Sequence, residues 1–416
     1  MYFGYVLLLA AAAGLAACTG FLSLLLVASF RFRRRRVPEI PADHFPPVTL
    51  LKPLCGMEPN LRENIASFFD QEYPEFEIIF GTRTVDDPAL AVVDEVRQDF
   101  PSVPVQIVVS GEPTEANAKV CSLQKMYSVA RYDCLVISDS DVEVKPHYLR
   151  EVVGPLTEPK VGMVTCAYRG TTNGGFWSRL EALGMSVEMT SGVLVADLLE
   201  GMNFALGPTM AIRREVLDAV GGFAPLAIYC ADDYVLGQRV AESGNTVVLS
   251  THVIDHVVVN RSLSASLLHQ VRWMKSTRFS RPAGHVASVL SFAMPFGLLG
   301  FVAAMALGWP MLAVALITIA FLNRVAMAVV AGWGVVRDPH ALRLCWLYPL
   351  RDLMGFGFWL CSFLGSNIVW RGQRYRLELN GLMVPQAAPS PLGEFIYGDA
   401  PLRKRVESPL TVEQVS

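Results

Sequence analysis

The 416-residue sequence lacks the motifs that mark several common classes of site. None of its eight cysteines forms a Cys-x-x-Cys pair and no zinc-site spacing is present, so we expect free, buried thiols in a reducing compartment. It has no Gly-x-Gly-x-x-Gly motif and no P-loop, which disfavours a dinucleotide site and a P-loop nucleotide site. The formal net charge of −3 leaves no basic excess, so we expect no nucleic-acid partner.

Charged residues are missing from two long stretches, which account for a mean hydropathy of +0.37. Residues 1–30 carry no charge and are long enough to cross the roughly 30 Å hydrocarbon core of a bilayer. A cleaved signal peptide would begin with a positive charge, but here the arginines at 31 and 33–36 follow the apolar run. We therefore expect a retained membrane anchor, with the chain after it in the cytoplasm.

The second uncharged stretch, residues 286–322, is too long for one span. The Gly-Trp-Pro turn in its middle predicts two helices, 287–306 and 311–333. A third candidate covers 347–369.

The third candidate begins beside Arg351 and Asp352, which mark either the membrane interface or a pair buried against other helices. An odd number of spans would put the basic segment 370–376 outside, against the positive-inside rule. The alternative is that one helix lies in the interface.

Between the apolar stretches, short apolar runs alternate with helical patterns, which predicts an α/β domain with a Rossmann-like parallel sheet covered on both faces. Asn60 and Asp87 are expected helix caps. The apolar part of 176–200 lies either along the membrane, lining the path of a lipid, or in the core. The expected strands are 47–54, 76–81, 103–109, 134–138, 161–168, 207–212, 245–249 and 253–259. The expected helices are 60–69, 88–99, 117–130, 146–153, 176–200, 214–220, 232–243 and 264–279.

Asp139 and Asp141 follow the buried strand 135–138. Ligands bind beyond the carboxyl ends of parallel strands, and two carboxylates there suit Mg²⁺ or Mn²⁺ holding a nucleotide diphosphate. A solvated turn is the competing interpretation.

Asp232 and Asp233 are adjacent at the start of a helix. They are either first-turn charges favoured by the helix dipole or a pair whose mutual repulsion raises one pKa to that of a general base. Arg272 and Trp273 are either part of this site or an interfacial anchor.

The ordered set of these motifs resembles an inverting GT-A glycosyltransferase and, more narrowly, the ceramide glucosyltransferase family, which includes bacterial hopanoid-associated glycosyltransferases. The resemblance covers about residues 48–376. Each motif alone is weak evidence for the family, whereas the ordered set of motifs is specific to it. The motifs are Leu51-Lys52-Pro53-Leu54-x-Gly56, Asp86-Asp87-Pro88-Ala89, Asn117-x-Lys119, Asp139-Ser140-Asp141, Arg213-Arg214-Glu215-Val216-Leu217 with Gly221-Gly222, Ala231-Asp232-Asp233-Tyr234, Arg272-Trp273 and Trp370-Arg371-Gly372-Gln373-Arg374-Tyr375.

The resemblance implies transfer of a sugar from a UDP-sugar to a lipid hydroxyl at the cytoplasmic face of a membrane. It implies that Asp139 and Asp141 bind the divalent metal, Mn²⁺ or Mg²⁺, and that Asp233 is the base that deprotonates the acceptor. It places Arg272 and Trp273 near the diphosphate and the acceptor. The residues that it assigns to donor and substrate binding are Asp87, near the uracil and ribose, together with Lys119, Asp139, Asp232 and His269.

The sugar and the lipid acceptor stay open. UDP-glucose and ceramide are the first expectation, and UDP-N-acetylglucosamine with a hopanoid such as bacteriohopanetetrol is the alternative. The alternative is favoured by segments 164–170 and 176–180, and by His269, which stands where the family's (Gln/Arg)-x-x-Arg-Trp motif begins. Ser122, where the family often has Asn, is a further departure. Two other possibilities are a non-catalytic membrane scaffold and a processive polysaccharide synthase, which would need a larger helical bundle.

These inferences divide the chain into a transmembrane anchor, a basic and Pro-rich linker, a cytoplasmic GT-A domain, C-terminal membrane or interfacial helices, and a basic segment with a disordered tail. We expect a multi-pass protein of the bacterial inner membrane. The boundaries are 1–30, 31–47, 48–284, 285–370 and 371–416, and the disordered tail is expected from Pro385 onward.

Overall fold

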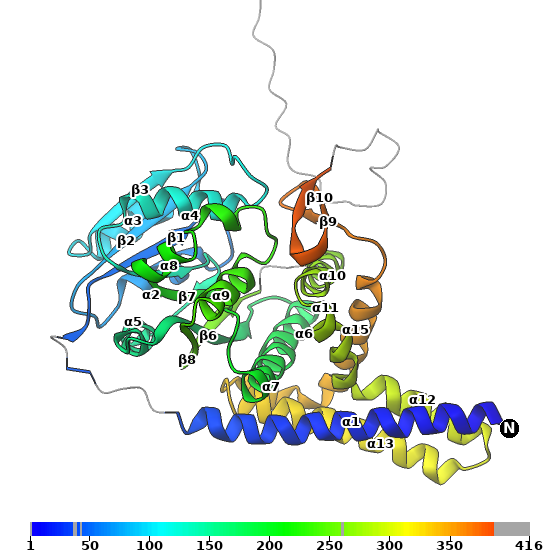
Figure 1. Cartoon of the computed structure of the whole chain (residues 1–416). Helices are drawn as coiled ribbons and strands as arrows, with labels where there is room; N and C mark the ends of the chain where they lie inside the picture. Colours follow the sequence, from blue (N-terminus) through cyan, green and yellow to red (C-terminus); the bar gives the residue numbers. More distant parts are fainter. Residues whose placement is uncertain (1, 36–39, 42–43, 259–261, 387–416) are drawn as a thin grey trace, which may run out of the picture.

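The computed structural model describes residues 2–35, 40–41, 44–258 and 262–386. An α/β domain built on an eight-stranded sheet lies against a group of apolar helices, and a small three-stranded sheet lies near the end of the described chain (Figure 1). The eight cysteines form no disulfide, but only Cys18, Cys134, Cys166 and Cys230 are buried. The expectation of buried thiols is therefore wrong for the exposed Cys55 and Cys361 and for two half-buried cysteines.

The first half of the domain is the parallel sheet that the alternating pattern predicts, in the order β3-β2-β1-β4. The side chains of β1, β2 and β4 are almost all buried, as expected for strands covered on both faces. The expected cap at Asn60 is wrong, because its side chain makes no capping hydrogen bond. The elements are β1 (Val48–Pro53), α2 (Leu61–Phe69), β2 (Phe76–Thr82), α3 (Ala89–Asp99), β3 (Val105–Val109), α4 (Ala118–Val129) and β4 (Cys134–Ser138).

The second half makes the sheet mixed rather than parallel throughout. β7 runs antiparallel to β4, and the full order is β3-β2-β1-β4-β7-β6-β8-β5. The two strands expected at 245–249 and 253–259 are one strand, with an irregularity opposite the Cys166/Ala167 step of β6. The elements are β5 (Val142–Glu143), α5 (Tyr148–Val153), β6 (Val161–Thr171), β7 (Thr209–Arg213), α8 (Arg214–Ala219), α9 (Asp232–Glu242) and β8 (Thr246–Val257).

The expected helix 176–200 is continuous, but it contains one π-helical turn. It is formed by α6 (Phe176–Gly184), η3 (Met185–Met189) and α7 (Thr190–Glu200). It is apolar enough to be a candidate span, yet 61% of its apolar window is buried inside the protein, between the sheet and α1 (Figure 1). Most of this helix therefore belongs to the core.

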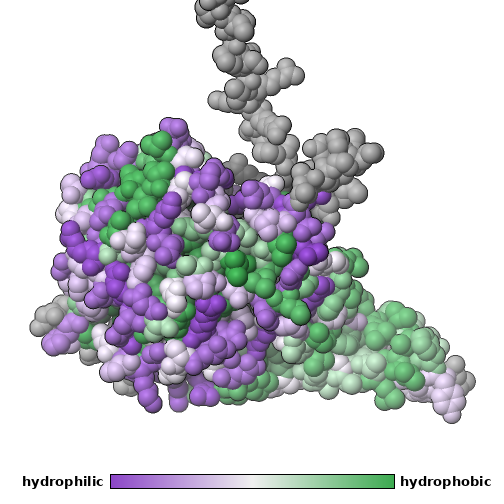
Figure 2. Space-filling model, turned by 45° about the horizontal axis from the view of Figure 1, so that its top comes forward, coloured by the Kyte–Doolittle hydropathy of each residue, from purple (hydrophilic) through white to green (hydrophobic). Residues whose placement is uncertain are grey.

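Among the residues that the structure describes, three helices are long and apolar enough to cross a membrane by length and composition, with one further bent pair. The three are α1 (Tyr2–Arg33), the helix 176–200 and Pro310–Trp333. α1 packs against α12 (Ala293–Ala306) and α13 (Pro310–Met327). Figure 2 shows an apolar surface over the projecting helices, in contrast to the polar surface of the α/β domain.

The single helix expected at 287–306 is wrong. The chain bends by 54° between Pro282–Ser291 and Ala293–Ala306. The Asp352 carboxylate accepts a hydrogen bond from the backbone N–H of Met294 at 2.8 Å, which satisfies one of the donors left free where α12 begins. The Asp352 carboxylate therefore stabilises the backbone at the bend.

The third expected span, 347–369, is also wrong. Its helix, α15 (Tyr348–Ser362), has 15 residues, or roughly 22 Å at 1.5 Å per residue, and is followed by strands. Arg351 and Asp352 are both buried, so they are a pair held against other helices rather than an interfacial mark. The linking helices are α10 (Leu263–Ser280), α11 (Pro282–Ala287) and α14 (Pro339–Arg343).

The basic segment after α15 forms an antiparallel sheet in the order β11-β10-β9. This sheet is not among the elements expected from the sequence. The disordered tail expected from Pro385 onward is wrong for Pro385, which ends β11, and from residue 387 it lies outside the described residues. The strands are β9 (Asn367–Trp370), β10 (Gln373–Leu377) and β11 (Met383–Pro385).

Candidate active site

Polar side chains converge at the carboxyl ends of β1 and β4. Lys52 lies near the end of β1, almost fully buried, with its Nζ atom 3.5 Å from the centre of the Phe68 ring. It donates a hydrogen bond of 2.7 Å to the backbone carbonyl of Asp139 and so fixes the loop after β4. Burial lowers the pKa of Lys52 to about 7, although Asp139 and Asp141 oppose the shift.

Lys119, in the first turn of α4, joins two of the acidic motifs. Its Nζ atom lies 2.6 Å from Asp139 Oδ1 and 4.0 Å from Asp232 Oδ2. Burial works against its charge, but the two carboxylates raise its pKa. The pKa of Asp139 is raised by burial, which outweighs the effect of Lys119.

Asn117 positions both Lys119 and Asp232. Its side-chain oxygen caps α4 by accepting from the Val120 N–H, and its amide donates to Asp232 Oδ1 at 3.0 Å. One residue thus holds the start of α4 against the start of α9.

Asp141 pairs with His256 on β8, with 3.1 Å between Asp141 Oδ2 and His256 Nε2. Burial opposes its ionisation, but His256 and Lys52 hold its pKa below the usual value. Its other oxygen, Oδ1, is buried and has no hydrogen-bond partner in the described part of the chain. Glu58 accepts from the Ser140 hydroxyl at 2.5 Å, and burial together with Asp141 raises its pKa.

Asp233 is held by the backbone. Its Oδ2 accepts from the Gly207 N–H at 2.6 Å and its Oδ1 from the Tyr234 N–H at 2.8 Å. A Cβ at position 207 would lie 3.0 Å from Asp233 Oδ2, which explains the glycine there. Burial and the neighbouring Asp232 raise the pKa of Asp233 to about 6, against the opposing charge of Lys119. A carboxylate with this pKa is suited to accept a proton near neutral pH.

α10 brings its residues to the same region. His269 Nδ1 lies 2.9 Å from Glu181 Oε1, and its ring lies 4.6 Å from that of Trp273. Trp273 also lies 6.4 Å from the ring of His256, the partner of Asp141. α10 is thus linked to the D-x-D motif through aromatic contacts.

Arg272 has no carboxylate partner among the described residues. Its guanidinium lies 5.6 Å from the centre of the Trp370 ring. Burial lowers its pKa, and the nearby charge of Arg371 adds to this effect. A half-buried guanidinium without a carboxylate partner among the described residues suits an anionic ligand.

The hydrogen-bond partners of Asp87 are backbone N–H groups outside this cluster. Its carboxylate accepts from the Ala89 N–H at 2.9 Å, so it caps α3 as expected. It also accepts from the Gly56 N–H at 3.0 Å, which ties the loop after β1 to that after β2. A role in binding uracil and ribose stays a prediction.

Several site residues were given no role from the sequence. One indication for Lys52 was present in the sequence, because a charged residue in a strand that is otherwise expected to be buried suggests a specific partner. Glu58, Glu181 and His256 follow no local pattern, because each is recognised only through a partner far along the chain.

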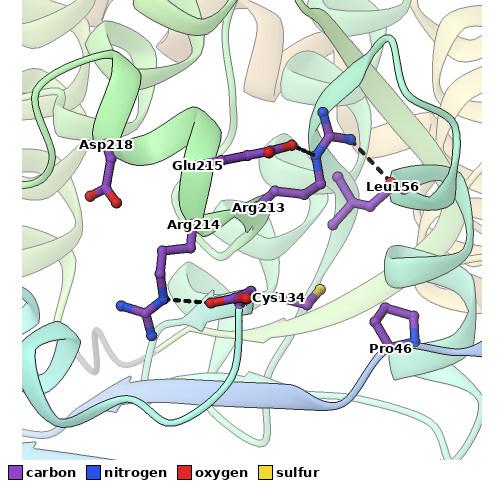
Figure 3. A pocket seen from close by; sticks show the side chains of 8 residues that line it. Pro46, Cys134, Leu156, Arg213, Arg214, Glu215 and Asp218 are labelled. Carbon is purple, nitrogen blue, oxygen red and sulfur yellow. Dashed lines mark hydrogen bonds and ion pairs between the residues drawn. The ribbon is translucent and has the colours of Figure 1, made fainter.

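A cavity of about 460 Å³ lies elsewhere, where β4 begins at Cys134. It contains none of the predicted site residues (Figure 3). Arg213 donates to the carbonyls of Leu156 and Pro159, and Arg214 pairs with Asp133 at 3.0 Å. These guanidiniums have protein partners already, so the cavity is not the centre of the chemistry.

Comparison with known proteins agrees with this geometry. Among solved structures, a mannosyltransferase from Pyrobaculum calidifontis, determined with GDP-mannose and Mn²⁺, is similar with a TM-score of 0.56 and 19% identity, covering 86% of this chain and 98% of that one. At this identity the likeness shows the fold alone, which is the GT-A fold.

Curated relatives are named ceramide glucosyltransferases. Ceramide glucosyltransferase 1 of Caenorhabditis elegans is 25% identical over 355 residues, covering 82% of this chain and 74% of the relative. Ceramide glucosyltransferase 3 of the same organism is 24% identical over 345 residues, with the same coverage. The family model for glycosyl transferase family 21 matches residues 7–383. The chain therefore belongs to glycosyl transferase family 21, and it is a glycosyltransferase with a GT-A domain.

Proposed function

We propose that this glycosyltransferase moves a sugar from a UDP-sugar to a lipid hydroxyl, with inversion at the anomeric carbon. Glucose is the proposed sugar and ceramide the proposed acceptor, in line with the names of the relatives. We place the reaction at the cytoplasmic face of the bacterial inner membrane. The apolar helices beside the α/β domain support a membrane site, because they would keep the domain next to a lipid acceptor.

The residues of the D-x-D motif fit a divalent cation such as Mn²⁺ or Mg²⁺. Asp139 and Asp141 offer hard oxygen atoms, and the buried Oδ1 of Asp141 has no partner among the described residues. When bound, the cation would supply positive charge beside the leaving diphosphate. Lys119 and Lys52 keep these carboxylates and their loop in place.

The observation that carries the proposal is the state of Asp233: a half-buried carboxylate, fixed by two backbone N–H groups, with its pKa raised to about 6. In the proposed step, Asp233 takes the proton of the acceptor hydroxyl while the hydroxyl oxygen bonds to the anomeric carbon. The bond from that carbon to the diphosphate oxygen breaks, and UDP leaves with the electron pair. Attack from the side opposite to the diphosphate inverts the carbon.

Arg272 would act on the leaving group. Its guanidinium has no protein carboxylate among the described residues, so its charge is available to the diphosphate. Trp273 and His269 lie beside it and would border the acceptor.

The test is a donor–acceptor matrix on the full chain purified in detergent. UDP-glucose and UDP-N-acetylglucosamine are crossed with ceramide and bacteriohopanetetrol, with Mn²⁺, Mg²⁺ or EDTA, and the products are identified by mass spectrometry. We expect glucosylceramide, lost in EDTA. N-acetylglucosaminyl hopanoid would replace the proposed sugar and lipid but keep the chemistry.

Two other outcomes would contradict the proposed single-sugar transfer itself. A polymer of several sugars would indicate a processive synthase. No product in any combination, with UDP still bound, would favour a scaffold that has kept the domain without its catalysis.

A further inference from the structure

The small C-terminal sheet is fixed beside the active site. The Cys230 N–H donates to the Gly381 carbonyl at 3.0 Å, and the Met383 N–H donates to the Ile228 carbonyl at 2.8 Å, just before the helix that begins at Asp232. Lys275 Nζ of α10 also donates to the Asn367 carbonyl at 2.9 Å. A separate apolar cluster fills the space beneath the sheet. Its members are Cys230, Ile368, Tyr375, Leu377 and Met383.

The turn between β9 and β10 has an unusual residue. Trp370 pairs with Gln373, so Arg371 and Gly372 form a two-residue loop. Their φ angles are +48° and +78°, as in a type I′ turn, which favours Asn-Gly. An arginine in the left-handed region costs roughly 1 kcal/mol, so Arg371 is not the residue that turn stability would select.

Arg371 lies where two halves of the site meet. The ring of its neighbour Trp370 lies 5.6 Å from the Arg272 guanidinium. The charge of Arg371 lowers the pKa of Arg272, and it also counteracts the raised pKa of Glu58, whose carboxylate holds Ser140 of the D-x-D motif. The β9–β10 turn therefore lies beside α10, and the charge of Arg371 also acts on Glu58, which holds the D-x-D loop.

We propose that Arg371 binds the diphosphate of the donor nucleotide together with Arg272, so that the C-terminal sheet completes the donor site. Two neighbouring guanidiniums repel each other, and a diphosphate between them would replace that repulsion with charge-assisted hydrogen bonds. The proposal rests on the proposed function, because it takes a nucleoside diphosphate as the donor's leaving group.

The test compares Arg371→Asn with Arg371→Lys and Arg376→Gln, in the full chain in detergent with Mn²⁺. Asparagine suits the type I′ turn, so we expect the thermal midpoint of R371N to stay equal or rise. We expect its affinity for UDP, measured by calorimetry, to fall roughly tenfold, which is what one charge-assisted hydrogen bond contributes. R371K should keep part of the affinity.

Arg376→Gln is the matched control, because it removes the same charge from the same sheet at an exposed pair with Glu378. We expect R376Q to bind UDP as the wild type does. Equal UDP affinity in R371N and wild type would overturn the inference and leave the proposed function standing. An equal loss in R371N and R376Q would also overturn it, as a general charge effect. A wild-type protein that binds no UDP would overturn the proposed function and the inference together.

Discussion

The protein contains two networks of charge, and they are built differently. Beside the apolar helices, charges are matched: Arg324 lies 3.1 Å from Asp352, and Arg351 lies 2.9 Å from Glu188. At the active site, carboxylates outnumber lysines. The carboxylates there are Glu58, Asp139, Asp141, Asp232 and Asp233, and the lysines are Lys52 and Lys119.

The difference separates a structural network from a functional one. In a matched pair each charged group faces a group of opposite sign, and removing one partner leaves the other uncompensated. A surplus of carboxylates is unfavourable by itself. Burial, together with the neighbouring Asp232, raises the pKa of Asp233, and Asp141 Oδ1 has no partner among the described residues. A bound cation and a substrate proton would relieve both, so the surplus fits catalysis rather than stability.

The largest expected effect comes from removing the base. Asp233→Asn keeps the shape but cannot take a proton, so we expect turnover to fall by roughly 10³-fold or more. UDP affinity, measured by calorimetry, should stay within about twofold, since Asp233 does not act on the nucleotide in the proposed step. A variant that keeps more than about a tenth of the activity would exclude Asp233 as the base.

Breaking the matched network should affect folding instead. Asp352→Asn leaves the buried Arg324 without its carboxylate, and we expect the free energy of unfolding to fall by about 3 kcal/mol or more, seen as a lower thermal midpoint in detergent. The control is Glu95→Gln at the exposed pair with Arg62, which should change stability by less than about 1 kcal/mol. Similar shifts in both variants would contradict the distinction.

Substituting a metal ligand should have a smaller effect than the two changes above. Asp141→Asn should weaken Mn²⁺ binding by about 10- to 100-fold, because a ligand carboxylate becomes a neutral amide. Electron paramagnetic resonance of free Mn²⁺ measures this without any turnover. Asp87→Asn is the control and should bind Mn²⁺ normally, since Asp87 caps α3 away from the D-x-D motif. Unchanged Mn²⁺ affinity in D141N would remove Asp141 from the site.

The smallest effect is on pH dependence. Asp233 must be deprotonated to act and its pKa is raised to about 6, so activity should be full above this pH and fall by roughly tenfold per unit below it. Asp232→Asn removes one cause of the raised pKa, so the acidic limb should move to lower pH. A pH–rate profile measures both. A limb that stays in place in D232N would mean that another group titrates.

The sequence predicted the parts of the fold that depend on local pattern. β1, α4 and β4 lie close to where the alternation of strands and helices puts them, because each buries a face within a few residues. The D-x-D motif was recognisable because it directly follows a buried strand. Roles for Asp233 and Arg272 came from a family resemblance, and their catalytic parts stay predictions.

Long-range features were not predictable in this way. The β9–β11 sheet is short and depends on contacts with residues 228–230, which lie 151 to 155 positions before their partners in the chain. The bend before α12 depends on Asp352, which lies 58 residues after its partner Met294. The same holds for His256, which pairs with a residue 115 positions away.

By itself, the sequence determined the apolar helices at 2–33 and 310–333, the alternating α/β pattern and the acidic motifs, because hydrophobic periodicity and strand-end carboxylates are local properties. The tertiary structure alone decided which charges are matched and which are in surplus. It buried Arg351 and Asp352 with partners from other helices, and it placed Lys119 between Asp139 and Asp232. The charge state of a buried group depends on neighbours that only folding brings within a few ångströms.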